Sequence, residues 1–305
     1  MDALGTIVSL LKPQAIGAKV VHGSGRWGVR YPAVGHPSFA LVLKGPCWLA
    51  VDGTPPTVLE SGDFVFFPAM PAFTLASDRK VRPVSVKPVP ADDRVEEVFH
   101  GDATLNPSAS LLGGYFAFDP TNAPMLLDFL PGMLHIRATE PAMAGMAPLV
   151  ALIQREAGQK LAGRALVLSR LVEVLLVEAL RCAPVGMDSG GLLAGLHDAR
   201  LAMALHGIHT QTAHQWSLDL LAREAAMSRS AFAERFARVM GTTPMNYLLQ
   251  WRIAVAKDML GREQASVGEA ALAVGYESAS AFSTAFSRET GRSPREFIGA
   301  GRRHG

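Results

Sequence analysis

A repeat at an offset of 50 residues, in the last third of this 305-residue chain, constrains the fold more than any other feature of the sequence. The segment from Ser228 to Phe232 recurs as Ser278 to Phe282. Four further residues recur at the same offset, because Phe236, Arg238, Gly241 and Pro244 return as Phe286, Arg288, Gly291 and Pro294. A repeat at fixed spacing indicates that one supersecondary unit is built twice.

Each copy has the pattern of an α-helix with defined ends. A serine precedes the apolar positions, two phenylalanines stand four residues apart, and a glycine closes the pattern with a proline three residues later. A shorter apolar helix is expected before each copy, over Leu218–Ala226 and Val267–Val274, with room between the helices only for a tight turn. Two helices joined by a tight turn form the outline of a DNA-binding helix-turn-helix, expected here at about 217–241 and 267–291.

The expected surface of the longer helices is compatible with contact to DNA. At 100° per residue Phe232, Phe236 and Val239 share the buried side, and the opposite side is small and polar with one arginine near the helix end. Small side chains allow close approach to base edges, and an arginine can reach a phosphate or a guanine. The alternative, an ordinary solvated face, is reasonable for one such helix, but the duplication argues against it. We expect base contacts from Ser230, Glu234, Ser280 and Thr284, and phosphate contacts from Arg235, Arg238, Lys257, Arg288, Arg292 and Arg295.

Residues from about 216 to 298 resemble the AraC/XylS-type DNA-binding domain. The second copy carries the resemblance most clearly, through Ala270 to Phe282 followed by Phe286, Gly291, Ser293, Pro294 and Phe297, and Arg252, Ala256 and Leu260 match the pattern of the helix that joins the two units, expected over Met245–Leu260. The resemblance implies two recognition helices that enter successive major grooves of duplex DNA. Thr284 stands where family members often carry arginine and Ser230 where some carry a large aromatic residue, so part of the specificity is expected to come from DNA shape.

Composition agrees with a packed protein of two domains but contributes little to the DNA argument. Hydrophobic residues make up 49% of the chain and the formal net charge is only +2. After His209 there are 12 Lys and Arg against 9 Asp and Glu, a slight basic excess on the side of the repeat. We expect a cytoplasmic protein without a membrane partner, because no signal peptide or apolar run of membrane length is visible and two cysteines provide no disulfide framework.

The first part of the chain has the pattern of a small β-barrel after a short helix over Asp2–Leu11. Short strand-like runs are separated by turn residues such as Gly45-Pro46 and Asp52-Gly53. Strands are expected over Ala18–Val21, Trp27–Tyr31, Phe39–Leu43, Cys47–Val51, Thr57–Leu59, Phe64–Phe67, Phe73–Ala76, Val95–His100 and Ala109–Phe118. Many short strands with regular turns are typical of a sandwich or barrel.

The runs Phe39–Gly45 and Leu59–Pro68 resemble a cupin, and residues from about 2 to 182 resemble the cupin-type sensor domain that precedes AraC-type DNA-binding domains. The resemblance implies that the barrel interior binds a small-molecule effector, without identifying the residues that bind it. A metal-dependent cupin enzyme is a weaker alternative, because Ala40 and Phe73 stand where metal-binding cupins would carry histidines, and His22 and His36 form no ligand-spaced pair. We therefore expect no catalytic residue, no metal and no cofactor, and we interpret Asp63 as a turn residue.

Cys47 leaves a second alternative open, a regulator that responds to thiol oxidation. It lies on an expected strand beside Trp48, where a free cysteine commonly behaves as a small hydrophobic residue. A redox switch would instead require an exposed thiolate of low pKa and usually a resolving partner.

The region between the two domains is expected to be helical and then to become a linker. In Pro141–Arg181 one stripe contains Leu168, Val172, Leu175 and Ala179 and another contains Leu171, Val174 and Val177, so we expect one side to cover the barrel. The second side would meet either the same helix of another subunit, giving a homodimer, or the preceding helix. Residues 183–191 form the expected linker, and a helix over Leu192–Leu205 would lead into the DNA-binding domain. His197, His206, His209 and His214 are interpreted as solvated side chains near the junction, with a pH or metal switch as the alternative.

The expected fold is therefore α+β and multidomain. It comprises a cupin-like barrel with helices over 1–182, a linker over 183–191, and an all-α domain with two helix-turn-helix units over 192–305. The expected function is a bacterial transcription regulator that binds duplex DNA by sequence and senses a small molecule, with RNA polymerase as a partner if it activates. The sequence identifies neither the effector, nor the operator, nor the direction of regulation.

Overall fold

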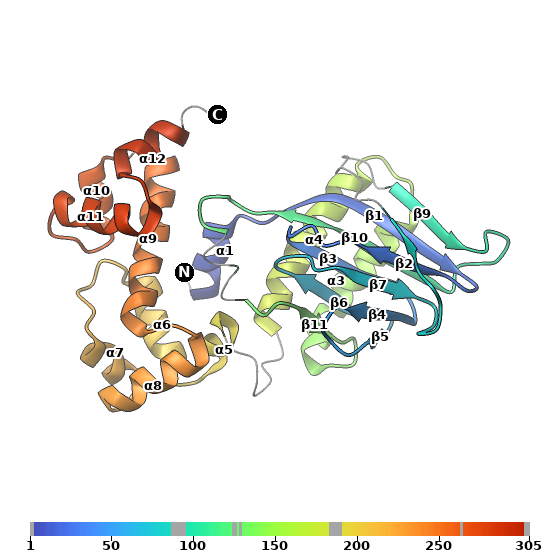
Figure 1. Cartoon of the computed structure of the whole chain (residues 1–305), viewed down its shortest axis with the longest axis horizontal. Helices are drawn as coiled ribbons and strands as arrows, with labels where there is room; N and C mark the ends of the chain where they lie inside the picture. The colour runs from blue at the N-terminus through green and yellow to red at the C-terminus, as the bar shows by residue number, and fades with distance from the viewer. Residues whose placement is uncertain are drawn as a thin grey trace. The chain divides into compact units, whose positions relative to one another are not determined.

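The computed structural model of the chain (Figure 1) describes residues 3–86, 96–123, 127, 130–182, 191–262 and 265–301. The chain divides into two compact units. The barrel unit consists of Pro13–Ala117 and Pro131–Pro184, and the helical unit consists of Met1–Lys12, Phe118–Leu130 and Val185–Gly305. Strands occur in the barrel unit and helix-turn-helix units in the helical unit, so the expected α+β architecture is confirmed. The expected linker lies outside the described residues up to position 190.

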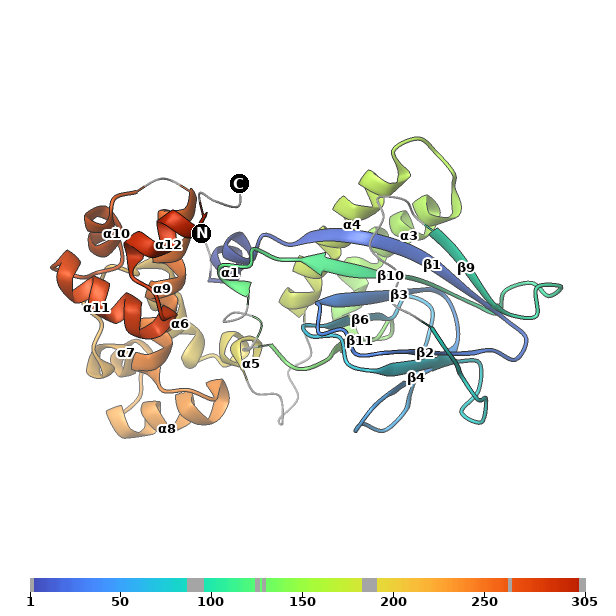
Figure 2. The same cartoon turned by 45° about the horizontal axis from the view of Figure 1, so that its top comes forward.

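Two sheets form the barrel unit (Figures 1 and 2). The strands are β1 (Gln14–Ser24), β2 (Gly28–Tyr31), β3 (Ser38–Lys44), β4 (Cys47–Val51), β5 (Thr57–Leu59), β6 (Phe64–Phe67), β7 (Phe73–Ala76), β8 (Val84–Ser85), β9 (Glu96–Gly101), β10 (Ala109–Ala117) and β11 (Leu134–Ile136). Within the described residues one sheet has the order β11-β6-β3-β10-β1-β9 and the other β5-β4-β7-β2-β8. The expected strands are all found: β4, β5, β6 and β7 have the expected ends, and the others have shifted ends. The strands β8 and β11, two and three residues long, were not anticipated.

Side chains from alternate positions of the strands fill the space between the two sheets. Successive side chains of a strand point to opposite faces, so residues two apart share an environment. Val42 and Val65 of the first sheet and Leu49 and Leu75 of the second belong to one buried cluster. This cluster and the cavity described below occupy the barrel interior.

The helices α3 (Pro141–Gly158) and α4 (Arg164–Cys182) pack together, and α4 lies along β1. The hydroxyl of Ser169 donates to the carbonyl of Ala15 at 2.8 Å, and Glu173 accepts from the backbone N–H of Ala15 at 3.0 Å. The expected stripe of Leu168, Val172, Leu175 and Ala179 is fully buried, which confirms that one side of this helix covers the barrel.

The helical unit begins with the first helix of the chain. Its helices are α1 (Ala3–Leu11), α5 (Leu192–His197), α6 (Leu201–Thr210), α7 (Leu218–Glu224), α8 (Arg229–Met240), α9 (Pro244–Arg262), α10 (Val267–Ala273), α11 (Ala279–Thr290) and α12 (Pro294–Gly301). Figure 1 shows α9 running from the region of α7 and α8 to that of α10 and α11. The grouping of α1 and Phe118–Leu130 with this unit comes from packing between segments distant in sequence.

One expected helix is interrupted. The pattern over Leu192–Leu205 predicted a continuous helix, but the structure has α5 and α6 with a break at Asp198. The carboxylate of Asp198 accepts from the backbone N–H groups of Arg200 and Leu201 at 3.0 and 3.1 Å, which caps α6. Its other oxygen pairs with Arg235 of α8 at 2.6 Å, so a tertiary ion pair fixes the break in place.

Among the described residues, no helix is both long and apolar enough to cross a bilayer.

Candidate nucleic-acid interface and barrel cavity

The first helix-turn-helix consists of α7 and α8, and its ends are those that the sequence predicted. The side chain of Ser228 accepts from the backbone N–H of Ala231 at the start of α8. Gly241 closes α8 in the left-handed region, with φ of 72°, where a side chain would be strained. Phe232 and Phe236 are completely buried, so the opposite side of α8 faces solvent.

The second helix-turn-helix consists of α10 and α11 and repeats these features. Ser278 caps α11 through the N–H of Ala281, and Gly291 closes it with φ of 71°. Phe282 and Phe286 are again completely buried. The duplicated pattern is therefore one structural unit built twice, as expected.

The two turns differ in length by one residue, a difference that the repeat at a constant offset of 50 residues does not show. Before the turn the capping serines Ser217 and Ser266 lie 49 positions apart, whereas after it Ser228 and Ser278 lie 50 apart. The left-handed residue of the first turn is Ala226, with φ of 49°, and that of the second is Gly275, with φ of 82°. The second turn is thus longer by one residue.

Gly275 also requires the absence of a side chain, because a Cβ atom would lie 2.5 Å from the carbonyl oxygen of Ala213. The segment before α7 is held against this turn by two further contacts. Gln215 donates to the carbonyl of Gly275 at 2.7 Å, and Arg252 of α9 donates to the carbonyls of Thr212 and His214 at 3.1 and 2.7 Å. These bonds connect the two helix-turn-helix units, and they provide a structural role for Arg252, the arginine of the motif on the joining helix.

The helix α9 belongs to the cores of both units. Tyr247 and Trp251 lie in the cluster around Phe232 and Phe236, and Ile253 and Leu260 lie in the cluster around Phe282 and Phe286. A single helix shared by two buried clusters fixes the spacing between α8 and α11. Fixed spacing is what two recognition helices require to reach sites on one duplex together.

The four residues expected to contact bases, Ser230, Glu234, Ser280 and Thr284, are exposed on α8 and α11. The hydroxyl of Thr284 donates to the carbonyl of Ser280 at 3.1 Å, so in the free protein it is used within its own helix. Ser280 and Thr284 line an open groove together with Arg295 of α12. A groove on this side of α11 brings two expected base contacts close to one expected phosphate contact.

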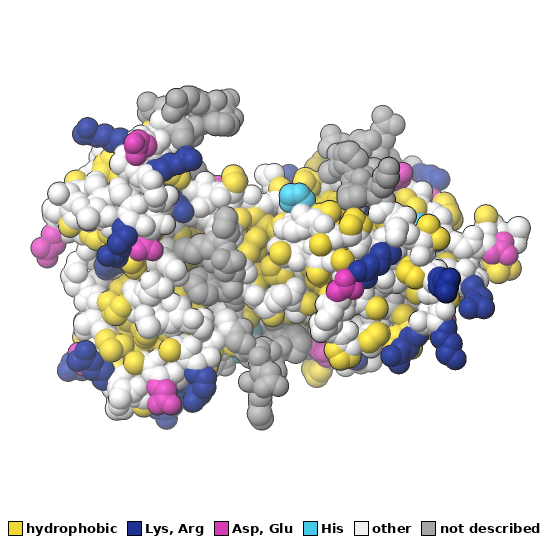
Figure 3. Space-filling model, viewed as in Figure 1, with side chains coloured by type: hydrophobic (Ala, Val, Ile, Leu, Met, Phe, Trp, Pro, Cys, Tyr) yellow, Lys and Arg dark blue, Asp and Glu magenta, His cyan; other side chains and the backbone are white. Residues whose placement is uncertain are grey.

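The expected phosphate contacts fall into two groups. Arg238, Arg288, Arg292 and Arg295 are exposed, although Nε of Arg288 donates to Glu289 at 3.2 Å. Arg235 instead binds Asp198, and the ammonium of Lys257 lies 3.4 Å from the carbonyl oxygen of Thr121 in a half-buried position, where burial lowers its pKa. On the face drawn in Figure 3, basic side chains of the helical unit are scattered and form no continuous stripe. Individual base and phosphate contacts remain predictions.

One of the junction histidines is not solvated as the sequence suggested. His206 and His214 are exposed, but His209 is buried and its Nε2 lies 2.7 Å from the hydroxyl of Tyr247. Burial lowers the pKa of His209 to about 3, so the imidazole is neutral at physiological pH. It is a core residue of the helical unit.

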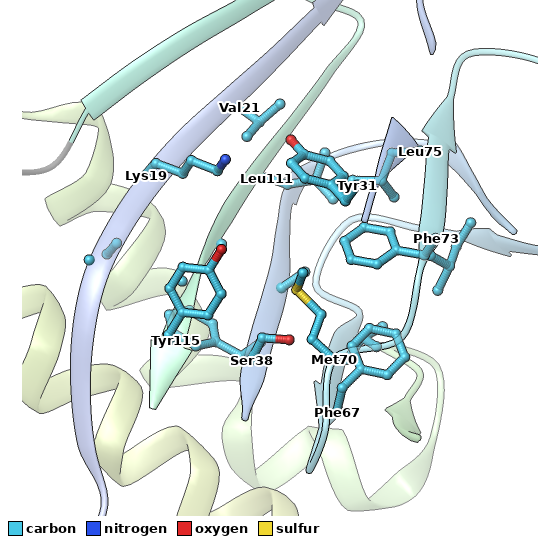
Figure 4. Close-up of a pocket in the computed structure, with 18 of the residues that line it drawn as sticks. Lys19, Val21, Tyr31, Ser38, Phe67, Met70, Phe73, Leu75, Leu111 and Tyr115 are labelled. Atoms are coloured by element: carbon cyan, nitrogen blue, oxygen red, sulfur yellow. The ribbon is translucent and has the colours of Figure 1, made fainter. Parts of the chain in front are cut away.

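The barrel interior contains a cavity of about 450 Å³, within the size range of small-molecule sites. Its walls come from both sheets and are mainly apolar, with contributions from Val21, Leu49, Leu59, Val65, Phe67, Met70, Phe73, Leu75 and Leu111. The polar side chains on the walls are those of Lys19, Tyr31, Ser38, Glu96 and Tyr115. Figure 4 shows Lys19 reaching into the cavity from β1. The sequence predicted a site in the barrel interior but none of these residues.

Cys47 is buried in the core between the sheets, with 1% of its surface exposed. Burial, together with the charges of Asp63 and Glu60, raises the pKa of its thiol to about 12. This environment is typical of a hydrophobic cysteine and opposite to that of a reactive thiolate.

The histidines of the barrel unit do not form a metal site in the described part of the chain, where no three His, Cys, Asp or Glu side chains gather around one point. The Nδ1 of His22 lies 2.8 Å from the hydroxyl of Ser110, and His36 is exposed. His135 of β11 binds Asp63 at 2.9 Å, a pair that sequence reasoning missed because the two residues are far apart in the chain.

Asp63 is a turn residue, as expected, but a buried one. Its carboxylate accepts from the backbone N–H groups of Glu60 and Ala138 in addition to His135. Burial alone would raise its pKa, but these three hydrogen bonds hold the pKa below its usual range. The carboxylate therefore fixes the turn before β6 and the end of β11.

Comparison with known proteins covers almost the whole chain. A family model described as cupin matches residues 2–183, and one described as a helix-turn-helix domain matches residues 221–300. An AraC-like transcription regulator of Streptomyces lividans is 35% identical over 97% of this chain and 98% of its own. The transcriptional regulator MtrA of Neisseria gonorrhoeae is 29% identical over 97% of this chain and 98% of its own. Among solved structures, the DNA-binding domain of AdpA in complex with a target DNA is 30% identical, covers 33% of this chain and 92% of its own, and has a TM-score of 0.33.

Proposed function

Because the chain belongs to the family of AraC-like transcription regulators, with a cupin domain before a helix-turn-helix DNA-binding domain, we propose that the barrel cavity binds its effector and alters DNA binding through two chain segments. One observation carries this proposal. Two of the strands that line the cavity, β1 and β10, adjoin segments of the helical unit, because α1 precedes β1 and the segment from Phe118 follows β10.

The first segment, α1, contributes to the core of the DNA-binding unit. Ile7, Leu10 and Leu11 are buried in the cluster that contains Phe232 and Trp251, and α1 packs against α6 and α9. Lys12, which follows α1 two residues before β1, makes an ion pair with Asp258 of α9 at 3.1 Å. A shift of β1 would therefore act on α9, the helix that spaces the two recognition helices.

The second segment, which follows β10, is attached at the same place. The backbone N–H of Asp119 donates to the carbonyl of Leu11 at 2.8 Å, and the carboxylate of Asp119 binds the ammonium of Lys12. Thr121 accepts from Lys257 of α9. Tight binding in the cavity is not sufficient for regulation, since an effector must favour one arrangement of these segments over another.

The test begins by selecting the genomic DNA fragments that the full chain binds with and without candidate metabolites. The affinity of the chain for one selected fragment is then measured as the effector is titrated. Lys12→Met should leave effector affinity unchanged and reduce the effector-dependent change in DNA affinity, because it removes the ion pairs with Asp119 and with Asp258 of α9. Lys160→Met, which changes an exposed lysine of the barrel unit, is the matched control. If Lys12→Met responds to effector as fully as the natural chain, this route of coupling is wrong.

We also propose a homodimer through the second side of α4. Leu166 and Val174 are 62% and 51% exposed, and Leu171 and Val177 are half-buried beside them. An apolar stripe of this kind on a helix is compatible with the same stripe of a second copy. Light scattering of the full chain should then give twice the chain mass, and Val174→Glu should give the mass of one chain; a natural chain that stays monomeric at micromolar concentration would exclude this interface.

Three further parts of the proposal follow from DNA binding. We place the protein in the cytoplasm, where duplex DNA is accessible, and expect contact with RNA polymerase if the protein activates transcription. A metal-dependent enzyme is disfavoured by Ala40 and Phe73 at the positions where metal-binding cupins carry histidines, and elemental analysis of the purified protein tests that alternative directly. The thiol-based alternative is disfavoured by the burial of Cys47.

A further inference from the structure

The cavity contains a lysine where strand alternation would place an apolar residue. Lys19 and Val21 of β1 both line the cavity, because residues two apart on a strand share a face. Gly17 and Ala18 line it as well, at an irregularity of the strand between Ile16 and Lys19. Its backbone partner on β10 is Gly113, which lines the cavity as well. The lysine therefore projects between the two sheets, while the covered outer face of β1 holds Val20.

The ammonium of Lys19 points into the barrel, and the residue is half-buried. Its nitrogen lies 4.8 Å from the centre of the Tyr31 ring, and Tyr31 belongs to β2 of the opposite sheet. Figure 4 shows the amino group directed into the space that Tyr31, Phe73 and Tyr115 surround. A lysine that only covered a strand edge would place its charged end in water.

The charge of Lys19 lacks a close counter-ion in the described part of the chain. Glu96, its neighbour on β9, raises the pKa of Lys19 through its charge, but no ion pair or hydrogen bond joins the two side chains there. His100 is the other titratable group that interacts with it electrostatically. Burial is the largest influence and lowers the pKa of Lys19. A buried cation without a close anion is costly, so a ligand anion would be stabilised at this position.

The other residues that line the cavity indicate the chemistry of the rest of the ligand. Phe73 stacks between Tyr31 and Phe67, with ring centres 4.9 and 5.7 Å apart, and forms an aromatic wall in the cavity. Burial raises the pKa of Tyr31 to about 12 and also raises that of Tyr115, so both phenols are neutral hydrogen-bond donors at neutral pH. Lys19 is the one cation among the described residues that line the cavity.

We infer that the effector is an apolar molecule with a single anionic head, a carboxylate in the simplest case, and that Lys19 binds this head while the aromatic wall holds the apolar body. This inference rests on the proposed sensing role of the barrel and specifies its ligand class. A neutral apolar ligand would leave the ammonium without a close anion. A dianion would exceed the one positive charge of a cavity that the Glu96 carboxylate also lines. The phenols of Tyr31 and Tyr115 are in position to add hydrogen bonds to the head.

The probes are octanoate, decanoate and 4-phenylbutyrate, each compared with its primary amide, which has the same apolar body without the charge. Calorimetric titration of the full chain at pH 7 should give dissociation constants at least tenfold lower for the acids than for the amides. A tenfold difference corresponds to ~1.4 kcal/mol. Lys19→Met should weaken the acids to the level of the amides and leave the amides unchanged, because it retains an apolar side chain of similar length.

Two further variants keep this test decisive. Lys160→Met, an exposed lysine of the same unit, should bind the acids as the natural chain does. Gly113→Leu should abolish the binding of acids and amides alike while Lys19 remains, because a Cβ there meets only the carbonyl oxygen of Phe39 at 3.5 Å and the longer side chain would enter the cavity. The circular dichroism spectrum and unfolding temperature of each variant establish that it is folded.

The assignment is overturned if the natural chain binds none of the three acids, if it binds acids and amides equally, or if folded Lys19→Met retains the preference for acids. The sensing function is tested separately by DNA affinity. Acids that bind through Lys19 without altering DNA affinity would contradict the sensing function and support the head-group assignment. A change in DNA affinity caused only by the amides would support sensing and contradict the assignment.

Discussion

Leu10→Ala should destabilise the DNA-binding unit, although Leu10 lies at the opposite end of the sequence from the two helix-turn-helix units. Leu10 is 6% exposed and belongs to the buried cluster that also contains Leu205, Phe236 and Trp251. Replacing a buried leucine by alanine removes apolar contact and leaves a cavity, at a cost of about 2–5 kcal/mol. Since ~1.4 kcal/mol changes an equilibrium tenfold, the best-protected amides of the unit should exchange ~30- to 4,000-fold faster.

Hydrogen exchange of the full chain, followed by mass spectrometry of peptides, measures this effect separately in each unit. Peptides from α6 and α9 should exchange faster in Leu10→Ala, whereas peptides from β3 and β10 should be unaffected. Leu272→Ala is the matched control, because Leu272 of the same unit is 65% exposed and its truncation should change stability by less than about 0.5 kcal/mol. Unchanged protection of α6 and α9 in a folded Leu10→Ala protein would refute the packing of α1 against these helices.

Three other predictions concern single side chains. Glu234→Ala should change the preferred DNA sequence, whereas Arg288→Ala should weaken binding to all sequences and reduce the salt slope by about 0.9; variants that lower affinity without either change would contradict this division. The unfolding free energy should fall by roughly 2 kcal/mol between pH 7.5 and pH 5, because His209 has a pKa of about 3 when folded and near 6.5 when unfolded, so that the unfolded chain binds more protons in this window. Denaturant titrations should show a smaller fall in His209→Gln, and an equal fall would assign the effect to other groups. Cys47, with a pKa of about 12, should react with iodoacetamide much more slowly than half-buried Cys182 at pH 8, and equal labelling rates by mass spectrometry would restore the redox alternative.

The two helix-turn-helix units were predictable because their signals are local. A serine cap, phenylalanines four residues apart and a closing glycine act within a few residues of one another, so the pattern of Ser228, Phe232 and Gly241 predicts its own helix. The break at Asp198 was missed, because it depends on Arg235 of another helix.

The sequence predicted that this part of the chain is a β-barrel, but not which side chains point into its interior. Alternation identified β1 as a strand and could not decide which of its faces was inside, because Lys19 and Val20 would each be acceptable on either side of a strand. Only pairing with β10 and the cover provided by α4 direct Lys19 into the cavity, opposite the ring of Tyr31. The short β11 and the ion pair between His135 and Asp63 likewise depend on contacts distant in sequence.

By itself the sequence determined most of the elements, their order and the DNA-binding module, since helix caps, apolar periodicity and turn residues act over a few neighbouring positions. Only the tertiary structure decided that α1 and the segment from Phe118 belong to the helical unit, and that a lysine lies in an apolar cavity. The physical reason is that burial depends on which distant segments meet, and an apolar residue such as Leu10 does not encode its partner.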